Sequence, residues 1–231
     1  MVEILGTPGN DELFGEVSID TLFGLEGDDT ILGLEGNDLI FGNQGADLLD
    51  GAEGDDTIFG GRDNDEITDI GGGNDLVFGN LGSDFINGGQ GNDRVFGGQE
   101  DDILAGGSGN DFVSGDKGND LLYGIDFLNL SNPGFGEIDT LSGGEGVDGL
   151  YIGSGSLSYY VGLGDEDFAL ITNFDLIEDF LFVSETDNLT FIDLSLEGFG
   201  VGTGIYSQTN DLIAFVQNVN ASQIELNIIP G

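Results

Sequence analysis

The chain has 231 residues, of which 45 are acidic and three are basic, so its formal net charge at pH 7 is −42. It contains no histidine and no cysteine, which excludes disulfides, thiolate or imidazole metal ligands, thiol nucleophiles and a Ser-His-Asp triad. A field of this sign disfavours nucleic acid and anionic membranes as partners and attracts small cations. The opening residues, MVEILGTPGNDELFG, lack a basic segment followed by an apolar run, so we expect no cleaved N-terminal signal peptide. No stretch approaches the roughly 20 apolar residues of a membrane-spanning helix.

A nine-residue repeat runs from Gly6 to Thr68, is interrupted by a one-residue insertion around Ile70 to Gly73, and resumes from Gly79 to Tyr123. Two more copies begin at Gly134 and Gly143. The eighth place of every copy is aliphatic, from Leu13 to Leu150, which a simple Asp/Gly linker would not maintain. The sixth place is always aspartate: Asp11, Asp20, Asp29, Asp38, Asp47, Asp56, Asp65, Asp75, Asp84, Asp93, Asp102, Asp111, Asp120, Asp139 and Asp148.

Glycine at the first and usually the fourth place predicts a six-residue turn, because such geometry often needs a positive φ that only glycine adopts cheaply. The last three residues then form a short strand whose eighth-place side chain faces inward. Two repeats make one coil of 18 residues, so every second repeat stacks on the same sheet at roughly 4.8 Å. The repeats therefore predict an all-β fold, a parallel β-roll.

Stacking brings the sixth-place carboxylates to within about 5 Å, where a pair repels by roughly 0.8 kcal/mol in water and by several times more inside a protein. Calcium suits this arrangement, because it takes six to eight oxygen ligands from carboxylates and turn carbonyls in flexible geometry. Magnesium demands a stricter octahedron, and zinc or copper would favour the missing histidines and cysteines. We therefore expect the fifteen sixth-place aspartates to bind multiple calcium ions. We expect Asp28, at a fifth place, to face solvent.

The repeats resemble the hemolysin-type, or RTX, calcium-binding family, whose unit reads Gly-Gly-x-Gly-x-Asp-x-aliphatic-x. The clearest copies are GGQGNDRVF from Gly88 and GGSGNDFVS from Gly106. The resemblance implies a right-handed parallel β-solenoid with calcium held between stacked turns by aspartate carboxylates and backbone carbonyls. The chain departs from the unit where Asp69 or Ile70 opens the irregular repeat, and where the fourth place is Ser18, Asp63, Glu100 or Glu137, which puts the sites at those turns in question.

We expect a β-roll over residues 6–151, with an inserted loop or hairpin at 124–133, and a β-rich C-terminal cap over residues 152–231. Apolar alternating runs such as LSYYVGLG, DFALITNF and LIAFVQNV indicate strands there. A cap would protect the open end of the roll, since solenoids need capping units. This region is similar to the segment that follows RTX repeats in cyanobacterial secreted proteins. The resemblance implies an uncleaved type I secretion signal at the extreme C-terminus.

These features predict a secreted or cell-surface calcium-binding repeat protein that folds outside the cell on binding about ten calcium ions and is not an enzyme. The alternative is a noncatalytic secretion and folding module of a larger hydrolase or adhesin. Ice binding would need threonine ladders in the turns, where this chain has residues such as Leu25, Glu26 and Gln44.

The two sheets differ at the ninth place. On one of them the ninth place holds Phe23, Phe41, Phe59, Phe78 and Phe96, whereas on the other it becomes polar, as at Asp50, Thr68 and Asn87. These rings predict a stacked aromatic ladder. They also predict a face that packs on a second copy or on the C-terminal region.

Overall fold

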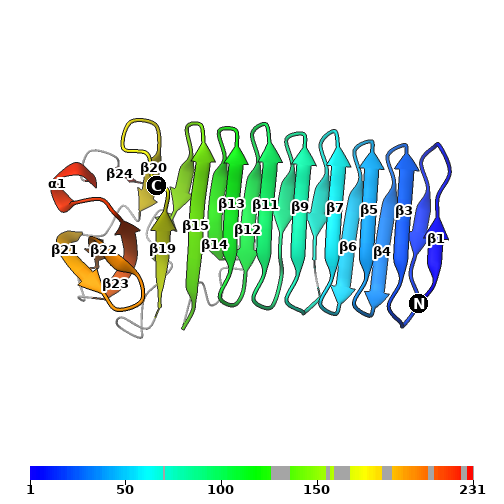
Figure 1. Cartoon of the computed structure of the whole chain (residues 1–231), viewed down its shortest axis with the longest axis horizontal. Coiled ribbons are helices and arrows are strands. Elements are labelled where there is room, and N and C mark those ends of the chain that lie inside the picture. The colour runs from blue at the N-terminus through cyan, green and yellow to red at the C-terminus, as the bar shows by residue number, and fades with distance from the viewer. Residues whose placement is uncertain are drawn as a thin grey trace.

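The computed structural model of the chain is an elongated parallel β-roll in which successive strands alternate between two sheets (Figure 1). It describes residues 1–69, 71–125, 136–154, 157–158, 167–183, 189–207, 211–224 and 228–230. The N-terminal strands lie at one end of the long axis, and the last strands and a short helix lie at the other. This architecture confirms the predicted all-β solenoid.

The first sheet contains twelve strands. In spatial order they are β1 (Glu3–Leu5), β3 (Thr21–Glu26), β5 (Leu39–Gln44), β7 (Thr57–Arg62), β9 (Leu76–Leu81), β11 (Arg94–Gln99), β13 (Phe112–Lys117), β15 (Ile138–Glu145), β19 (Phe168–Thr172), β23 (Leu212–Gln217), β22 (Gly200–Tyr206) and β21 (Thr190–Leu196).

The second sheet contains ten strands. They are β2 (Glu12–Phe14), β4 (Thr30–Glu35), β6 (Leu48–Glu53), β8 (Glu66–Thr68), β10 (Phe85–Asn87), β12 (Ile103–Gly107), β14 (Leu121–Ile125), β16 (Gly149–Tyr151), β20 (Phe180–Val183) and β24 (Ile228–Pro230). A short antiparallel pair, β17 (Gly153–Ser154) and β18 (Leu157–Ser158), and one helix, α1 (Ala221–Ile224), complete the described elements.

The register within both sheets is the predicted one of 18 residues. Leu22 pairs with Ile40 in the first sheet, and Ile31 pairs with Leu49 in the second. The inserted residue is absorbed between β8 and β9, because Ile58 still pairs with Val77 at an offset of 19 residues. Two repeats therefore make one coil throughout the regular part of the roll.

The strands are longer than predicted, and the prediction of positive φ at the first glycine is wrong. Six residues make up each of β3, β4, β5, β6, β7, β9, β11 and β13, because these strands continue through the first three places of the following repeat. The left-handed φ values fall at the second and fourth places, as at Leu25 (88°) and Gly27 (117°), whereas the first-place Gly24 has no such value. The left-handed residues therefore follow the first glycine, which must serve another purpose.

The aliphatic side chains of the eighth place form the core between the two sheets. Fourteen of the fifteen are at most 1% exposed, and Leu13, in the first coil, is half-buried and packs against the others. Each strand thus contributes one principal inward side chain, as the period of two in a strand requires. The core therefore consists mainly of one column of inward side chains from each sheet, and it runs along the roll.

The ninth-place phenylalanines form the predicted aromatic ladder on the first sheet. Neighbouring rings from Phe23 to Phe96 are stacked with centroids 4.9 to 5.1 Å apart. The second sheet is polar at Asp50 and Thr68, yet it carries a shorter ladder near its C-terminal end. There the rings of Tyr123, Tyr151 and Phe182 stack at 4.4 and 4.3 Å.

Strands of the C-terminal region extend both sheets of the roll. Strand β19 adds to β15 and β20 adds to β16, both in parallel, while β23, β22 and β21 continue the first sheet as an antiparallel meander. Ile205 and Val216 join the same apolar core as the repeats. Most of the predicted insertion at 124–133 and of the predicted strand in LSYYVGLG lies outside the described residues.

Candidate metal sites

The sixth-place aspartates form two columns, one along each row of turns. In each column the backbone N–H of one aspartate donates to Oδ1 of the aspartate on the next coil. Asp29 donates to Asp47 at 2.8 Å, and Asp38 donates to Asp56 at 2.6 Å. The pattern crosses the insertion, where Asp56 donates to Asp75, and the 124–133 segment, where Asp120 donates to Asp148. From Asp20 onward, one carboxylate oxygen of each of these aspartates thus holds adjacent turns in register.

The second oxygen of most of these aspartates has no hydrogen-bond donor. All fifteen except the half-buried Asp11 are buried, with at most 3% of the residue exposed. Oδ2 is buried and without a protein partner in Asp29, Asp38, Asp47, Asp56, Asp65, Asp75, Asp84, Asp93, Asp102, Asp111, Asp120 and Asp148. A buried carboxylate oxygen without a donor is costly, so each of these positions favours either protonation or a bound cation.

The first glycine of the repeat creates the space in which these oxygens lie. A Cβ atom built on Gly42 would contact Oδ2 of Asp47 and would lie 2.6 Å from the carbonyl oxygen of Gly60 on the next coil. The carboxylate of one turn and a carbonyl of the next therefore border one small space. The same arrangement recurs at Gly79, beside Asp84 and the carbonyl of Gly97. Glycine is required there for close approach and not for its backbone conformation.

The electrostatics of the column oppose ionisation when no cation is present. Burial raises the pKa of Asp47 to about 6, of Asp56 to about 7 and of Asp65 to about 8, despite the N–H that each accepts. Neighbouring carboxylates in the same column raise these pKa values further. The turns thus favour a neutral acid or a bound positive charge over an isolated carboxylate.

Three of the predicted ligands differ from the other twelve. Oδ2 of Asp11 accepts the N–H of Thr7 at 2.5 Å, and Oδ2 of Asp20 accepts the N–H of Glu16 at 2.7 Å. The Glu16 N–H holds the pKa of Asp20 below its usual value. Asp139 takes its place in the column, where it accepts the N–H of Asp111 at 2.9 Å. The first two turns of the roll therefore satisfy their carboxylates within the chain.

Fifth-place residues lie outside these columns. Asp28 is exposed, and its Oδ1 accepts the N–H of Ala46 at 3.1 Å. Asn37 likewise accepts the N–H of Asp55 at 3.2 Å. The fifth place thus forms an outer hydrogen-bonded ladder between the turns.

Asp179 extends one column beyond the repeats and was missed in the sequence. Its Oδ1 accepts the N–H of Asp148 at 3.2 Å, and its Oδ2 accepts the N–H of Asp175 at 2.7 Å. It is followed by the buried Leu181 and the stacked Phe182, as the eighth and ninth places of a repeat would be. The spacing Asp-x-Leu-Phe was the available signal, but the glycines that define the other turns are absent.

Calcium fits the chemistry of the turns. The available ligand atoms are carboxylate and carbonyl oxygens, which calcium prefers, and they converge at first-place glycines on consecutive coils. Bound calcium would supply the positive charge that the orphaned Oδ2 atoms lack.

Comparison with known protein families supports the same chemistry. The model of the RTX calcium-binding nonapeptide repeat matches the chain in four copies, at residues 5–40, 32–67, 69–104 and 96–124, which together cover more than half of it. The curated proteins contain no match to this chain.

Proposed function

Because the chain belongs to the RTX calcium-binding nonapeptide repeat family, we propose that it is a secreted protein that folds outside the cell on binding about ten calcium ions. The ordered roll then has a structural or cell-surface role. The observation that carries this proposal is the pair of aspartate columns, in which twelve buried Oδ2 atoms have no donor from the protein.

The fifteen sixth-place aspartates are the proposed ligands, together with first-place glycine carbonyls. Support is most direct at the twelve aspartates whose Oδ2 has no donor. It is weaker at Asp11 and Asp20, where both carboxylate oxygens accept hydrogen bonds. We place the irregular turn at Asp69 among the sites as well, for reasons given below.

Folding that depends on calcium follows from the charge of the chain. The formal net charge is −42, and the columns bury carboxylates at successive coils. Without a cation, closing the roll concentrates these charges and removes them from water, whereas binding of calcium to the folded state alone shifts the equilibrium towards the roll. At the low calcium of a cytosol the chain would stay extended enough for export, and it would fold at the millimolar calcium outside.

The proposal assigns no catalytic activity to the protein. The chain has neither histidine nor cysteine, and its fifteen sixth-place aspartates are the proposed calcium ligands. Its charge disfavours binding to nucleic acid. Within the described ranges, no helix has the length and apolar character needed to cross a membrane.

We also propose that residues 6–151 are the calcium-dependent unit and that residues 152–231 contain the cap and an uncleaved type I secretion signal. The parallel addition of β19 and β20 to the roll supports the capping role. Export of a passenger protein fused to residues 152–231, in cells with and without a type I secretion apparatus, tests the signal.

The central experiment follows the circular dichroism and sedimentation of the full chain during a calcium titration. We expect a largely disordered, expanded chain in excess chelator and a compact, β-rich one at about millimolar calcium. Magnesium at the same concentration is the control and should have a much smaller effect. Identical spectra and sedimentation in chelator and in calcium would overturn the proposal.

A further inference from the structure

Asp69 occupies the first place of the irregular repeat, where every other described repeat of the regular roll has glycine. Its backbone N–H donates to the carbonyl of Asn87 at 3.0 Å, just as the first-place Gly88 donates to Ala105 at 3.0 Å. The inserted residue therefore follows Asp69 and does not displace it from the first-place position. Asp69 thus places a side chain with a carboxylate at a position where the repeat has glycine, which has no side chain.

This substitution changes the oxygens at one turn. At Gly42, the nearest oxygens to an added Cβ belong to Asp47 and to the carbonyl of Gly60. At Gly51, they belong to Oδ2 of Asp56 and Oδ2 of Asp69, the latter at 2.7 Å. The Asp69 carboxylate thus takes the position that a glycine carbonyl takes in the ordinary turns.

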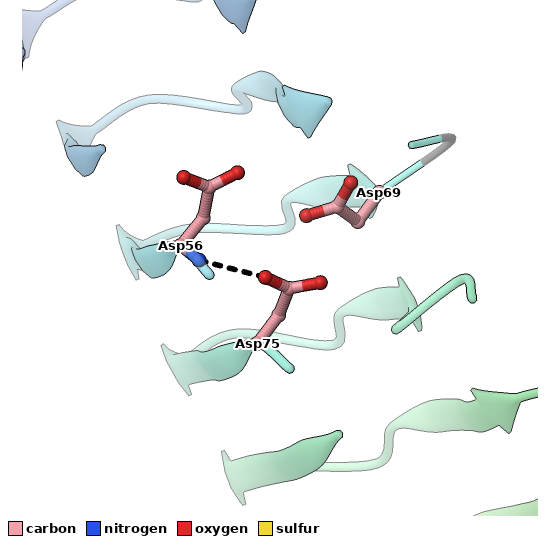
Figure 2. A group of neighbouring side chains, drawn as sticks. All are labelled: Asp56, Asp69 and Asp75. Atoms are coloured by element: carbon pink, nitrogen blue, oxygen red, sulfur yellow. Dashed lines mark hydrogen bonds between the residues drawn. The ribbon is translucent and has the colours of Figure 1, made fainter. Parts of the chain in front are cut away.

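A third carboxylate, that of Asp75, completes the group. Asp75 lies on the coil after Asp56, and its Oδ1 accepts the Asp56 N–H at 2.7 Å. Ligand oxygens of Asp56, Asp69 and Asp75 all lie within 4.8 Å of one another. Figure 2 shows the three carboxylates, from three separate segments, gathered around a common space.

The three side chains are buried and each has an oxygen without a donor. Asp56, Asp69 and Asp75 are each 2% exposed. Oδ2 of each has no hydrogen-bond partner, while Oδ1 of Asp69 accepts a long hydrogen bond of 3.3 Å from the N–H of Gly71. Three buried carboxylates, each with an unpartnered oxygen and with ligand oxygens within 4.8 Å of one another, favour a bound cation, in contrast to a solvated acidic surface.

We propose that Asp56, Asp69 and Asp75 form a calcium site with three carboxylates that binds calcium more tightly than the ordinary turns and fills first. This inference rests on the proposed calcium binding but assigns a ligand, Asp69, that lies outside the repeat motif. The reason for the tighter binding is charge, because the third carboxylate replaces a neutral carbonyl and calcium affinity rises with the number of charged ligands. Such a site lies near the middle of the repeats and would order the coils on both sides of the insertion.

The test is a calcium titration of the full chain against a competing chromophoric chelator, which resolves tight from weak sites. The wild type should show one site whose calcium dissociation constant is at least about tenfold lower than the average of the other sites. In Asp69→Asn the tight step should disappear, while the weaker steps remain. Asp69→Gly restores the motif residue and should convert the tight site into one of ordinary affinity.

The matched control is Asp63→Asn, because Asp63 is an exposed acid in the turn that holds Asp65, on the opposite row of turns, with a φ of 72° that asparagine tolerates. This variant loses the same charge and should retain the tight step. A wild type whose sites are all of equal affinity, or a tight step that survives in both Asp69 variants, overturns the inference and leaves the proposed function intact. A wild type that binds no calcium overturns both.

Discussion

The backbone N–H of Asp38 donates to Oδ1 of Asp56, which lies 18 residues later on the next coil, at 2.6 Å. Oδ2 of Asp56 has no donor from the protein. Each column aspartate of this kind therefore has two separate roles. One oxygen fixes the stacking of the turns, and the other is available to a cation.

Removal of a column aspartate should affect both roles. In the wild type the buried N–H of Asp20 donates to Asp38 at 2.7 Å, and in Asp38→Ala it loses this acceptor. The loss should lower the free energy of unfolding by about 1–3 kcal/mol. Calcium should also be lost at that turn. Asp28→Ala removes an exposed fifth-place carboxylate that accepts one N–H and should cost only about 0.5–1.5 kcal/mol. Bound calcium per chain and unfolding by denaturant measure the two effects. Equal calcium loss in both variants would show that the ligand place is assigned wrongly.

A methyl group at a first-place glycine should block one turn without straining its backbone. In Gly42→Ala the new Cβ would meet Oδ2 of Asp47 and the carbonyl oxygen of Gly60, so the space for calcium is filled. We expect weaker calcium binding, and we expect overpacking to lower the free energy of unfolding by about 1–3 kcal/mol. Gly9→Ala is the control, because nothing lies within 4 Å of the Cβ position at Gly9. Calorimetric titration with calcium compares the two, and unchanged binding in Gly42→Ala would argue against this site geometry.

The calcium-free roll should be more stable in acid than at neutral pH. Burial raises the pKa of Asp56 to about 7 and of Asp102 to about 8, above the value of about 3.9 in the unfolded chain. A raised pKa in the folded state gives stability that is complete below about pH 4 and is lost as the pH rises through about 7 to 8. Circular dichroism of protein freed of calcium by dialysis should show more β structure at about pH 5 than at about pH 8.

The same protonation should oppose metal binding, because protons and calcium compete for the carboxylates. Calcium affinity measured on the same preparation should therefore fall on acidification. If acid instead reduces the β structure of the calcium-free chain, the buried columns do not control its folding.

The phenylalanine ladder is predicted to be an interface as well as a stacked array. The rings from Phe23 to Phe96 are only half-buried along the first sheet, so their outer edges remain available. We expect calcium-loaded protein to self-associate in sedimentation experiments and Phe41→Ser with Phe59→Ser to shift it towards monomer.

The matched control for this face is Leu48→Ser with Ile103→Ser, which removes two side chains that are 42% and 37% exposed on the second sheet. That variant should sediment like the wild type. A wild type that remains monomeric at every concentration would leave the ladder with a stacking role alone.

The nine-residue sequence pattern by itself determined the alternation of sheets, the 18-residue coil, the aliphatic core and the columns of aspartates. It could do so because these features repeat, and any error in register would expose a whole column of Leu, Ile and Val. The pattern did not determine which glycine relieves strain and which allows close approach. That distinction depends on atoms of the next coil, such as the carbonyl of Gly60 above Gly42.

Only the tertiary structure decided the positions of Asp69 and Asp179. Asp179 lacks the glycines of a repeat, and its place in a column depends on the pairing of β20 with β16. In the sequence, Asp69 is a departure from the repeat pattern next to an insertion, and it lies 13 residues from Asp56 and six from Asp75. The stacking of coils brings the three carboxylates together, because parallel pairing places residues of successive coils side by side whatever their separation along the chain.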